Sequence, residues 1–152
     1  MTTHSNLEQA FLRGALAASA TTAAKAIGQL DPDDFAHSEH ATIAAAVYKR
    51  AQALATQAAV DPAAVMADLV DQGAGDTTRT AMIAVSTGNP PTPAELPRLA
   101  QALRTARIRR AASTVGEHLT QASTGSLADL QRAFSNVHTL TDLAARAGLA
   151  AE

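Results

Sequence analysis

Apolar side chains recur every three or four positions along most of the chain, which is the spacing of one face of an α-helix. Together with the cap and turn residues between them, they predict helices over residues 5–16, 21–29, 39–54, 62–72, 76–85, 96–123 and 127–146. Aromatic residues make up only 3% of the chain, and runs of β-branched residues are few. The pattern therefore predicts an all-α protein.

Several predicted helix starts have recognisable caps. Asp31-Pro32 and Asp61-Pro62 each place an N-cap aspartate before a proline at the first helical position. Three further starts have the spacing of a cap: Ser5 with Glu8, Thr92 with Glu95, and Ser126 with Asp129. Phe35 follows the first Asp-Pro pair and is expected to anchor the corner between two helices. We interpret the stretch from Leu30 to Leu69 as a folding signal without reactive chemistry.

The long helix predicted after the Gly88–Pro91 break carries two apolar faces in succession. The first face consists of Leu96, Leu99 and Leu103. The second face, turned well around the helix axis, consists of Ile108, Ala111, Val115, Leu119 and Ala122. The last predicted helix bears one apolar stripe, formed by Leu127, Leu130, Phe134, Val137, Leu140 and Ala144. We therefore expect a compact multi-helix head over residues 1–91, followed by a C-terminal helical hairpin arm over residues 92–152.

A two-helix hairpin leaves apolar surface uncovered, so the arm is predicted to pair with a second copy of the chain. The residues expected at this dimer interface are Val115, Leu119, Leu130, Phe134 and Val137. The same stripe can also complete the core of the monomer, and the two roles are compatible. The residues expected to hold the head together are Leu30, Phe35, Ile43, Val65 and Leu69. Because the chain is rich in alanine, each helix contact buries little apolar area, and association is a natural source of further burial.

Composition argues against several classes of protein. A formal net charge of −2 disfavours a protein whose main role is to coat phosphate backbones. The chain has no cysteine, which excludes disulfides and thiolate chemistry. No apolar run approaches the ~20 residues of a membrane span, and the N-terminus lacks the pattern of a secretion signal. We therefore expect a cytoplasmic protein with no membrane partner.

His37 and His40 raise the question of a metal site, because three carboxylates stand near them: Asp33, Asp34 and Glu39. Histidines that bind a metal from one helix more often stand four residues apart with a third ligand beyond, and no such ligand is evident from the sequence. We therefore expect no metal and no other cofactor, and assign the two histidines to packing and hydrogen bonding at a helix start. The remaining histidines are expected on the surface: His4, His118 and His138.

The adjacent acids Asp33 and Asp34 could in principle act as general acid and base. No nucleophile, set of oxyanion donors or glycine-rich phosphate cradle accompanies them in the sequence. Acids are also expected in the first turn of a helix, where their negative charge interacts favourably with the positive end of the helix dipole. The sequence therefore predicts a capping role for these acids and no catalytic residue.

One stretch of the long helix concentrates basic residues: Arg98, Arg104, Arg107, Arg109 and Arg110. On a helical wheel they scatter around nearly the whole circumference, whereas a helix that reads a DNA groove gathers its basic residues on one face. The residues considered for contact with a partner protein or with nucleic acid are Arg104, Arg107, Arg109 and Arg110. We expect contact with DNA to be at most indirect, with a helical DNA-binding module as an alternative.

A series of short motifs runs from Leu7 to Ala122. Residues 8–16 read Glu-Gln-Ala-Phe-Leu-Arg-Gly-Ala-Leu. They fit the pattern Glu-Gln-x-hydrophobic-Leu-x-Gly, although Arg13 stands at a position that this pattern usually fills with a small residue. The motifs that follow are a corner at Leu30, Pro32, Asp34 and Phe35, a pair at His40 and Ile43, a segment at Val60, Asp61 and Val65, and a proline-bearing break before a helix with Arg109-Arg110. In this order and spacing the chain resembles the N-terminal domain of bacterial replicative helicases of the DnaB type.

This resemblance implies a helical head with a helical hairpin, a homodimer through the hairpin, and trimers of dimers that form the N-terminal collar of a hexameric ring. It also implies docking of primase or of a helicase loader. The chain contains no Gly-x-x-x-x-Gly-Lys-Ser/Thr loop, so the ATPase motor of such a helicase is not part of it. The sequence leaves open whether the chain is part of a longer helicase or a free-standing accessory protein that binds or regulates a helicase. The helicase-binding C-terminal domain of primase, which has a related helical architecture, is a further alternative.

Overall fold

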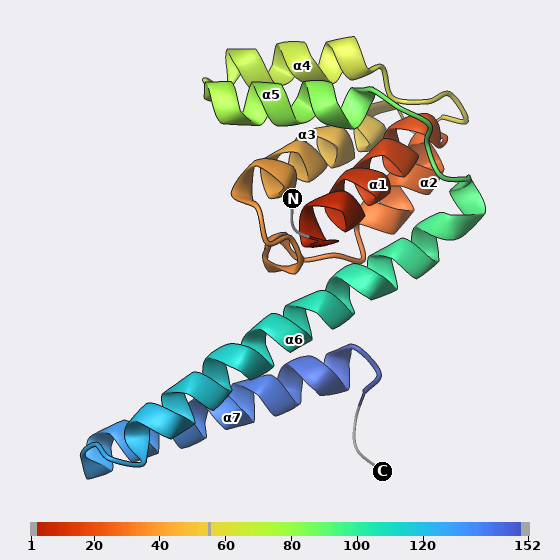
Figure 1. Cartoon of the computed structure of the whole chain (residues 1–152). Coiled ribbons are helices and arrows are strands. Elements are labelled where there is room, and N and C mark those ends of the chain that lie inside the picture. The colour runs from red at the N-terminus through yellow and green to blue at the C-terminus, as the bar shows by residue number, and fades with distance from the viewer. Residues whose placement is uncertain (1–2, 55, 150–152) are drawn as a thin grey trace. The chain divides into compact units, whose positions relative to one another are not determined.

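The computed structural model describes residues 3–54 and 56–149. These residues form seven α-helices and two short 3-10 helices and contain no β-strand (Figure 1). In chain order the elements are α1 (Thr3–Ala17), α2 (Ala20–Ile27), η1 (Pro32–Asp34), α3 (Ser38–Leu54), α4 (Pro62–Asp71), α5 (Asp76–Ser86), η2 (Pro93–Glu95), α6 (Leu96–Ala122) and α7 (Leu127–Arg146). The all-α prediction is confirmed. None of the described helices is long and apolar enough to cross a membrane.

The chain divides into two compact units. The first unit, which we call the head, comprises α1 to η2 together with α6 as far as Leu103. The second unit, which we call the hairpin, comprises α6 from Arg104 onward and α7. The first apolar face of α6 belongs to the head, because Leu96 and Leu103 are buried in the head's core and Leu99 packs against it.

Helix α3 is at the centre of the head and packs against α1, α2, α4 and α5. The largest fully buried apolar side chains there include those of Phe11, Leu12, Ile43, Leu69, Met82, Leu96 and Leu103. Of the residues expected to hold the head, only Leu30 is partly rather than mostly buried, and it packs against the core. The rings of Phe11 and Phe35 lie 6.3 Å apart between their centres, so Phe35 anchors its corner as predicted.

Alanine fills much of the space between the helices of the head. The buried alanines of the head include Ala15, Ala18, Ala20, Ala23, Ala44, Ala46, Ala51 and Ala100. Small side chains allow close helix contacts, and α1 lies so close to its neighbours at Gly14 that a side chain there would collide with them. A Cβ atom at Gly14 would lie 2.8 Å from Pro91 Cγ and 3.0 Å from Leu96 Cδ2. Only a hydrogen atom therefore fits between α1 and the segment that leads into α6.

Most of the predicted helix caps are present. Asp61 caps α4 by accepting a hydrogen bond from the Ala63 N–H at 3.0 Å. Reciprocal capping boxes are formed by Thr92 with Glu95 and by Ser126 with Asp129. Helix α4 ends before Gly73, whose φ of 76° lies in the left-handed region that glycine adopts without strain. These local predictions are confirmed.

Asp31-Pro32 starts only one 3-10 turn, η1, rather than a longer helix. Asp34 closes that turn, because its Oδ2 atom accepts a hydrogen bond from the Asp31 N–H at 2.8 Å. Asp34 is almost completely buried, whereas Asp33 is exposed. The acidic pair is therefore split between two environments, and the capping interpretation of Asp34 is confirmed.

The predicted capping box of Ser5 with Glu8 is wrong. Helix α1 begins at Thr3, so Ser5 lies inside the helix, where its hydroxyl accepts a hydrogen bond from Gln9 Nε2 at 3.3 Å. Glu8 is only 1% exposed, and its carboxylate accepts a hydrogen bond from the Ala36 N–H. The sequence spacing suits a cap, but partners far away in the sequence decide the role of this carboxylate.

Arg13 of α1 closes the C-terminal end of α5. Its guanidinium donates hydrogen bonds to the carbonyl oxygens of Ala84 at 3.0 Å and Val85 at 3.3 Å. Carbonyls in the last turn of a helix lack intrahelical partners, and a cation near them is favoured by the helix dipole. This contact gives a structural reason for an arginine at a position where the resemblance leads one to expect a small residue.

We expect Arg13→Ala to lower the free energy of unfolding by about 1–2 kcal/mol, because it leaves the last carbonyls of α5 without this donor. Urea denaturation followed by circular dichroism measures the change. Lys49→Ala, which removes an exposed cation that is not in the last turn of its helix α3, serves as a matched control and should cost less than about 0.5 kcal/mol. Equal losses for the two variants would contradict the capping role of Arg13.

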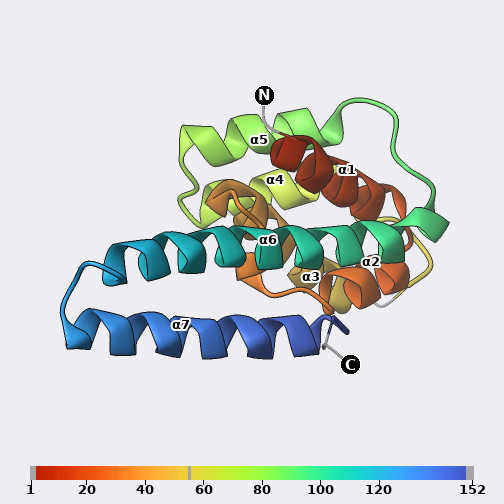
Figure 2. The same cartoon turned by 60° about the horizontal axis from the view of Figure 1, so that its bottom comes forward.

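In the hairpin, α6 and α7 run antiparallel and side by side, joined by a turn at residues 123–126 (Figures 1 and 2). His118 Nδ1 on α6 and Asn136 Nδ2 on α7 form a hydrogen bond of 3.0 Å. Val115 and Ala122 of α6 are buried, as is Ala133 of α7. The prediction of a C-terminal helical hairpin is confirmed.

Candidate functional site

The apolar stripe of α7 lies beside the contact between α6 and α7. The side of α7 that faces α6 runs through Ala133, Asn136 and Leu140, which line two grooves between the helices. Phe134 and Leu127 of the stripe are turned away from Ala133 by about a quarter to a third of a turn, since successive helical residues are about 100° apart, whereas Leu140 belongs to both the stripe and the line. Accordingly, Leu127 and Phe134 are 73% and 63% exposed. Packing within the hairpin therefore leaves these two large apolar side chains open.

Leu119 of α6 and Val137 of α7 lie on the same side of the hairpin. Each comes one residue after a member of the His118–Asn136 pair, which joins the two helices across their contact. In two antiparallel helices that face each other, the residue after a contact residue is rotated by about 100° toward the same side of the pair in both helices. The pairing also places Leu119 nearly level with Phe134. We call this side the hairpin face, formed by Leu119, Leu127, Leu130, Phe134 and Val137.

Four of the five residues predicted for the dimer interface belong to the hairpin face. Phe134 is exposed, and the other three are half-buried: Leu119, Leu130 and Val137. The fifth, Val115, is 8% exposed and lines a groove of about 240 Å³ between α6 and α7. Val115 therefore offers a partner little surface within a single hairpin. Leu127 adds to the face, although the sequence analysis did not place it at the interface.

The arginines considered for contact with nucleic acid or a partner differ in exposure. Arg109 is exposed, whereas the side chains of Arg104, Arg107 and Arg110 are half-buried. A nucleic-acid interface depends on basic groups that reach phosphates together. Of these four arginines, only Arg109 is exposed, and the geometry gives no support to a groove-reading helix.

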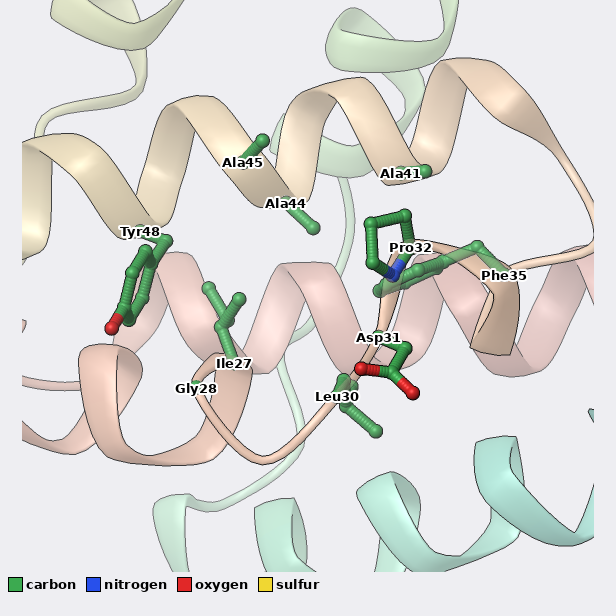
Figure 3. A pocket seen from close by; sticks show the side chains of 10 residues that line it. All are labelled: Ile27, Gly28, Leu30, Asp31, Pro32, Phe35, Ala41, Ala44, Ala45 and Tyr48. Atoms are coloured by element: carbon green, nitrogen blue, oxygen red, sulfur yellow. The ribbon is translucent and has the colours of Figure 1, made fainter. Parts of the chain in front are cut away.

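The head carries an apolar groove of about 240 Å³ between α2, η1 and α3 (Figure 3). Leu30 and Phe35, which the sequence analysis assigned to the head, help to line it together with Ile27 and Tyr48. Asp31 is the one carboxylate among the lining residues. General acid–base chemistry needs at least a second positioned group, so this groove has the character of an apolar contact surface rather than a reaction site.

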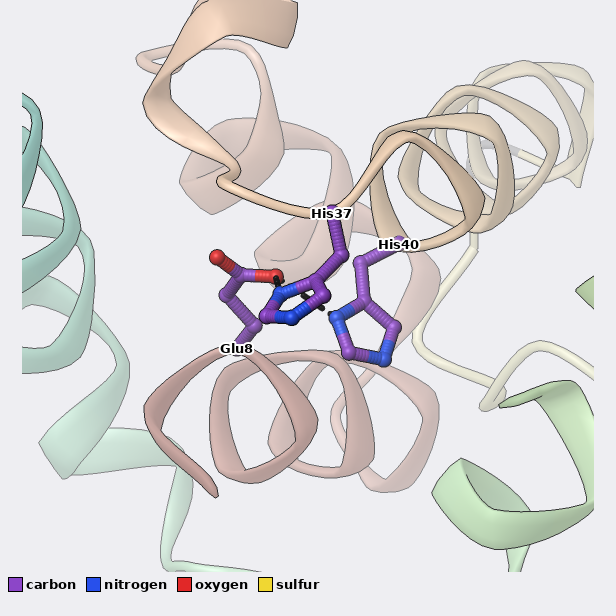
Figure 4. Close-up of side chains that lie close together, drawn as sticks. All are labelled: Glu8, His37 and His40. Carbon is purple, nitrogen blue, oxygen red and sulfur yellow. Dashed lines mark hydrogen bonds and ion pairs between the residues drawn. The ribbon is translucent and has the colours of Figure 1, made fainter. Parts of the chain in front are cut away.

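A polar cluster occupies the interior of the head, where Glu8 meets His37 and His40 (Figure 4). Glu8 comes from α1, His40 from the first turn of α3, and His37 from the residue just before α3. Glu8 Oε2 lies 2.6 Å from His40 Nδ1 and 3.0 Å from His37 Nδ1. The other oxygen, Glu8 Oε1, accepts a hydrogen bond from the Ala36 N–H at 2.6 Å. Both carboxylate oxygens are thus engaged.

Two opposing effects act on the pKa of the Glu8 carboxyl. Burial, the larger single effect, raises the pKa because it penalises the charged form. The hydrogen bonds from His40, the Ala36 amide and His37 lower it, and together they outweigh burial, so that the pKa of Glu8 lies below its usual value. Glu8 is therefore ionised at neutral pH. An ionised carboxylate only accepts hydrogen bonds, so both imidazoles carry their proton on Nδ1.

The sequence analysis identified His37 and His40 but missed the acid that joins them. Glu8 stands 29 residues before His37 and 32 residues before His40, so no local motif connects the three. The periodicity of α1 nevertheless held a clue. Glu8 lies three and four residues before Phe11 and Leu12, on the apolar face of the helix. An acid on a buried face needs polar partners, and the two histidines supply them.

The fold is that of a helical domain with a compact head and a helical hairpin that exposes large apolar side chains. Comparison with protein families identifies it more closely: the DnaB-like helicase N-terminal domain matches residues 1–105. The chain therefore belongs to the family of DnaB-like helicase N-terminal domains. The match covers the head and ends near the start of the hairpin. Neither the curated proteins nor the solved structures contain a significant match to the chain.

Proposed function

We propose that the chain is a non-catalytic oligomerisation and protein-interaction domain of a replicative DNA helicase. In this role two copies pair through the hairpin face, and three such dimers form the N-terminal collar of a hexameric ring. The collar then offers a docking surface to primase or to a helicase loader in the cytoplasm. DNA contact is at most indirect.

The observation that carries this proposal is the hairpin face itself. A two-helix hairpin has only one internal contact, and here that contact uses Ala133 and its neighbours while Phe134 and Leu127 stay open. Aromatic side chains such as Phe134 are typical centres of protein interfaces, where they fill a pocket on the partner. In a symmetric dimer the same face serves both copies, so one apolar surface satisfies two chains. The family of the head supplies the helicase context.

Sedimentation equilibrium of the 152-residue chain tests the pairing directly. We expect a species of twice the single-chain mass of 15.6 kDa at micromolar concentration. A strict monomer at high micromolar concentration would contradict the pairing. A pull-down with primase, helicase and loader from the source organism tests the docking role. Capture of an intact helicase instead of primase or a loader would favour the alternative of a free-standing accessory protein.

A further inference from the structure

Glu8, His37 and His40 bring together one carboxylate and two imidazoles inside the head (Figure 4). One potential ligand atom from each residue lies within 4.8 Å of the other two. Two histidines with one glutamate form a donor set that zinc uses in proteins. The expectation that no metal binds here rested on the lack of a third ligand, and the fold supplies that ligand from α1. The question of a metal site is thereby reopened.

We propose that Glu8, His37 and His40 form a binding site for a divalent transition-metal ion of the zinc type. The ligand atoms are Glu8 Oε2 and the Nδ1 atoms of the two histidines. The site is separate from the proposed role of the hairpin, because all three ligands belong to the head.

The observed distances are close to those of a coordination shell. Ligand atoms about 2.0–2.1 Å from a tetrahedral zinc ion stand about 3.3 Å from one another. Glu8 Oε2 lies 2.6 and 3.0 Å from the two Nδ1 atoms. The three ligand atoms all lie within 4.8 Å of one another. The two contacts of Glu8 Oε2 would have to widen by less than about 1 Å to reach the spacing around zinc. The long Glu8 side chain and the partly exposed ring of His37 can supply this movement.

The surroundings of the cluster suit a metal site in two further ways. The Ala36 N–H holds Glu8 Oε1, which directs Oε2 toward the two imidazoles, and such outer hydrogen bonds orient metal ligands in proteins. The side chains of Glu8 and His40 are almost completely buried, whereas that of His37 is 33% exposed. His37 therefore lies at the edge of the cluster that is nearest to solvent.

Metal binding requires a defined change in the positions of protons. The hydrogen bonds to ionised Glu8 place a proton on Nδ1 of each ring, and a metal needs the Nδ1 lone pair instead. A ring that binds the ion through Nδ1 must therefore release its Nδ1 proton to solvent and carry a proton on Nε2. This tautomer change distinguishes a ligand from a histidine that only packs or donates a hydrogen bond.

Calorimetric titration of the 152-residue chain with Zn²⁺ tests the site. We expect one ion per chain to bind through the cluster, and at least about tenfold weaker binding for His37→Gln. This variant should stay folded, because a glutamine amide at this partly exposed position can still donate a hydrogen bond to Glu8. Circular dichroism verifies the fold. Zn²⁺ should also raise the thermal unfolding midpoint of the wild-type chain, and His37→Gln should lose that rise.

His138→Gln is the matched control. His138 is exposed and lies 3.9 Å from Asp142 on α7, so this pair could hold zinc weakly at the surface. The control should keep the affinity and the thermal shift of the cluster. Nitrogen-15 NMR of the imidazoles of the wild-type chain should show the protons of His37 and His40 moving from Nδ1 to Nε2 with zinc. Unchanged affinity in His37→Gln, loss of binding in His138→Gln alone, or Nδ1 protons that persist at saturating zinc would each overturn the proposal.

Discussion

Phe134→Asp is expected to turn the dimer of the 152-residue chain into a monomer that keeps its helices. Phe134 is 63% exposed within one chain, so the aspartate meets solvent and not a core. In a dimer the same position would hold an unpaired charge in an apolar interface. Loss of a central aromatic contact at an interface costs at least about 2 kcal/mol, and a buried charge adds to this. We expect the dissociation constant to rise by at least about 100-fold.

Sedimentation equilibrium measures this change, and far-UV circular dichroism reports the helices. Ser135→Asp is the matched control, because it places the same charge one residue further on, at an exposed position about 100° away and off the hairpin face. It should leave the dimer intact. A wholly unfolded Phe134→Asp chain would place Phe134 in the monomer core instead, and a dimer that survives the substitution would move the interface elsewhere.

Glu8→Ala is the substitution expected to cost the head most. It leaves the Ala36 N–H and the Nδ1–H groups of His37 and His40 without their common acceptor, and it opens a cavity beside α1. Breaking a buried network by removing one partner costs about 3–5 kcal/mol. Urea denaturation at neutral pH measures this loss. A loss below about 1 kcal/mol would show that the cluster does not hold the head together.

The isosteric variant Glu8→Gln separates charge from shape. The pKa of Glu8 is lowered in the folded state, so its contribution is fully present above the unfolded-state pKa of a glutamate and is lost as the pH falls through the folded-state pKa. The stability difference between wild type and Glu8→Gln should therefore be large at neutral pH and narrow in acid. Denaturation curves from pH 7 down to about pH 3 test this. A difference that stays constant over this range would contradict the pKa assignment.

The local features of the fold were predictable from the sequence. Helix order followed from apolar periodicity, and the caps at Asp61 and Ser126 followed from side chains that bond backbone groups within three residues. Such contacts depend on neighbours that the sequence displays directly. The all-α fold and the C-terminal hairpin were predictable for the same reason.

What escaped prediction depends on residues far apart in the chain. The spacing of Ser5 and Glu8 suits a capping box, yet the buried partners of Glu8 lie about thirty residues away. Arg13 likewise meets the end of α5 more than seventy residues later. In the hairpin, periodicity found the apolar stripe but not the neighbouring line through Ala133 that packs on α6. A helical wheel shows which residues share a side and leaves open which side meets the other helix.

The absence of a side chain at Gly14 affects how the head tolerates substitutions in α1. A single methyl group there would push on Pro91 and on Leu96, which opens α6. The volume of the residue at position 14 in α1 therefore directly affects the first turn of α6, the helix whose later part belongs to the hairpin. A substitution in α1 can in this way disturb the first turn of α6, although the two segments are far apart in the sequence.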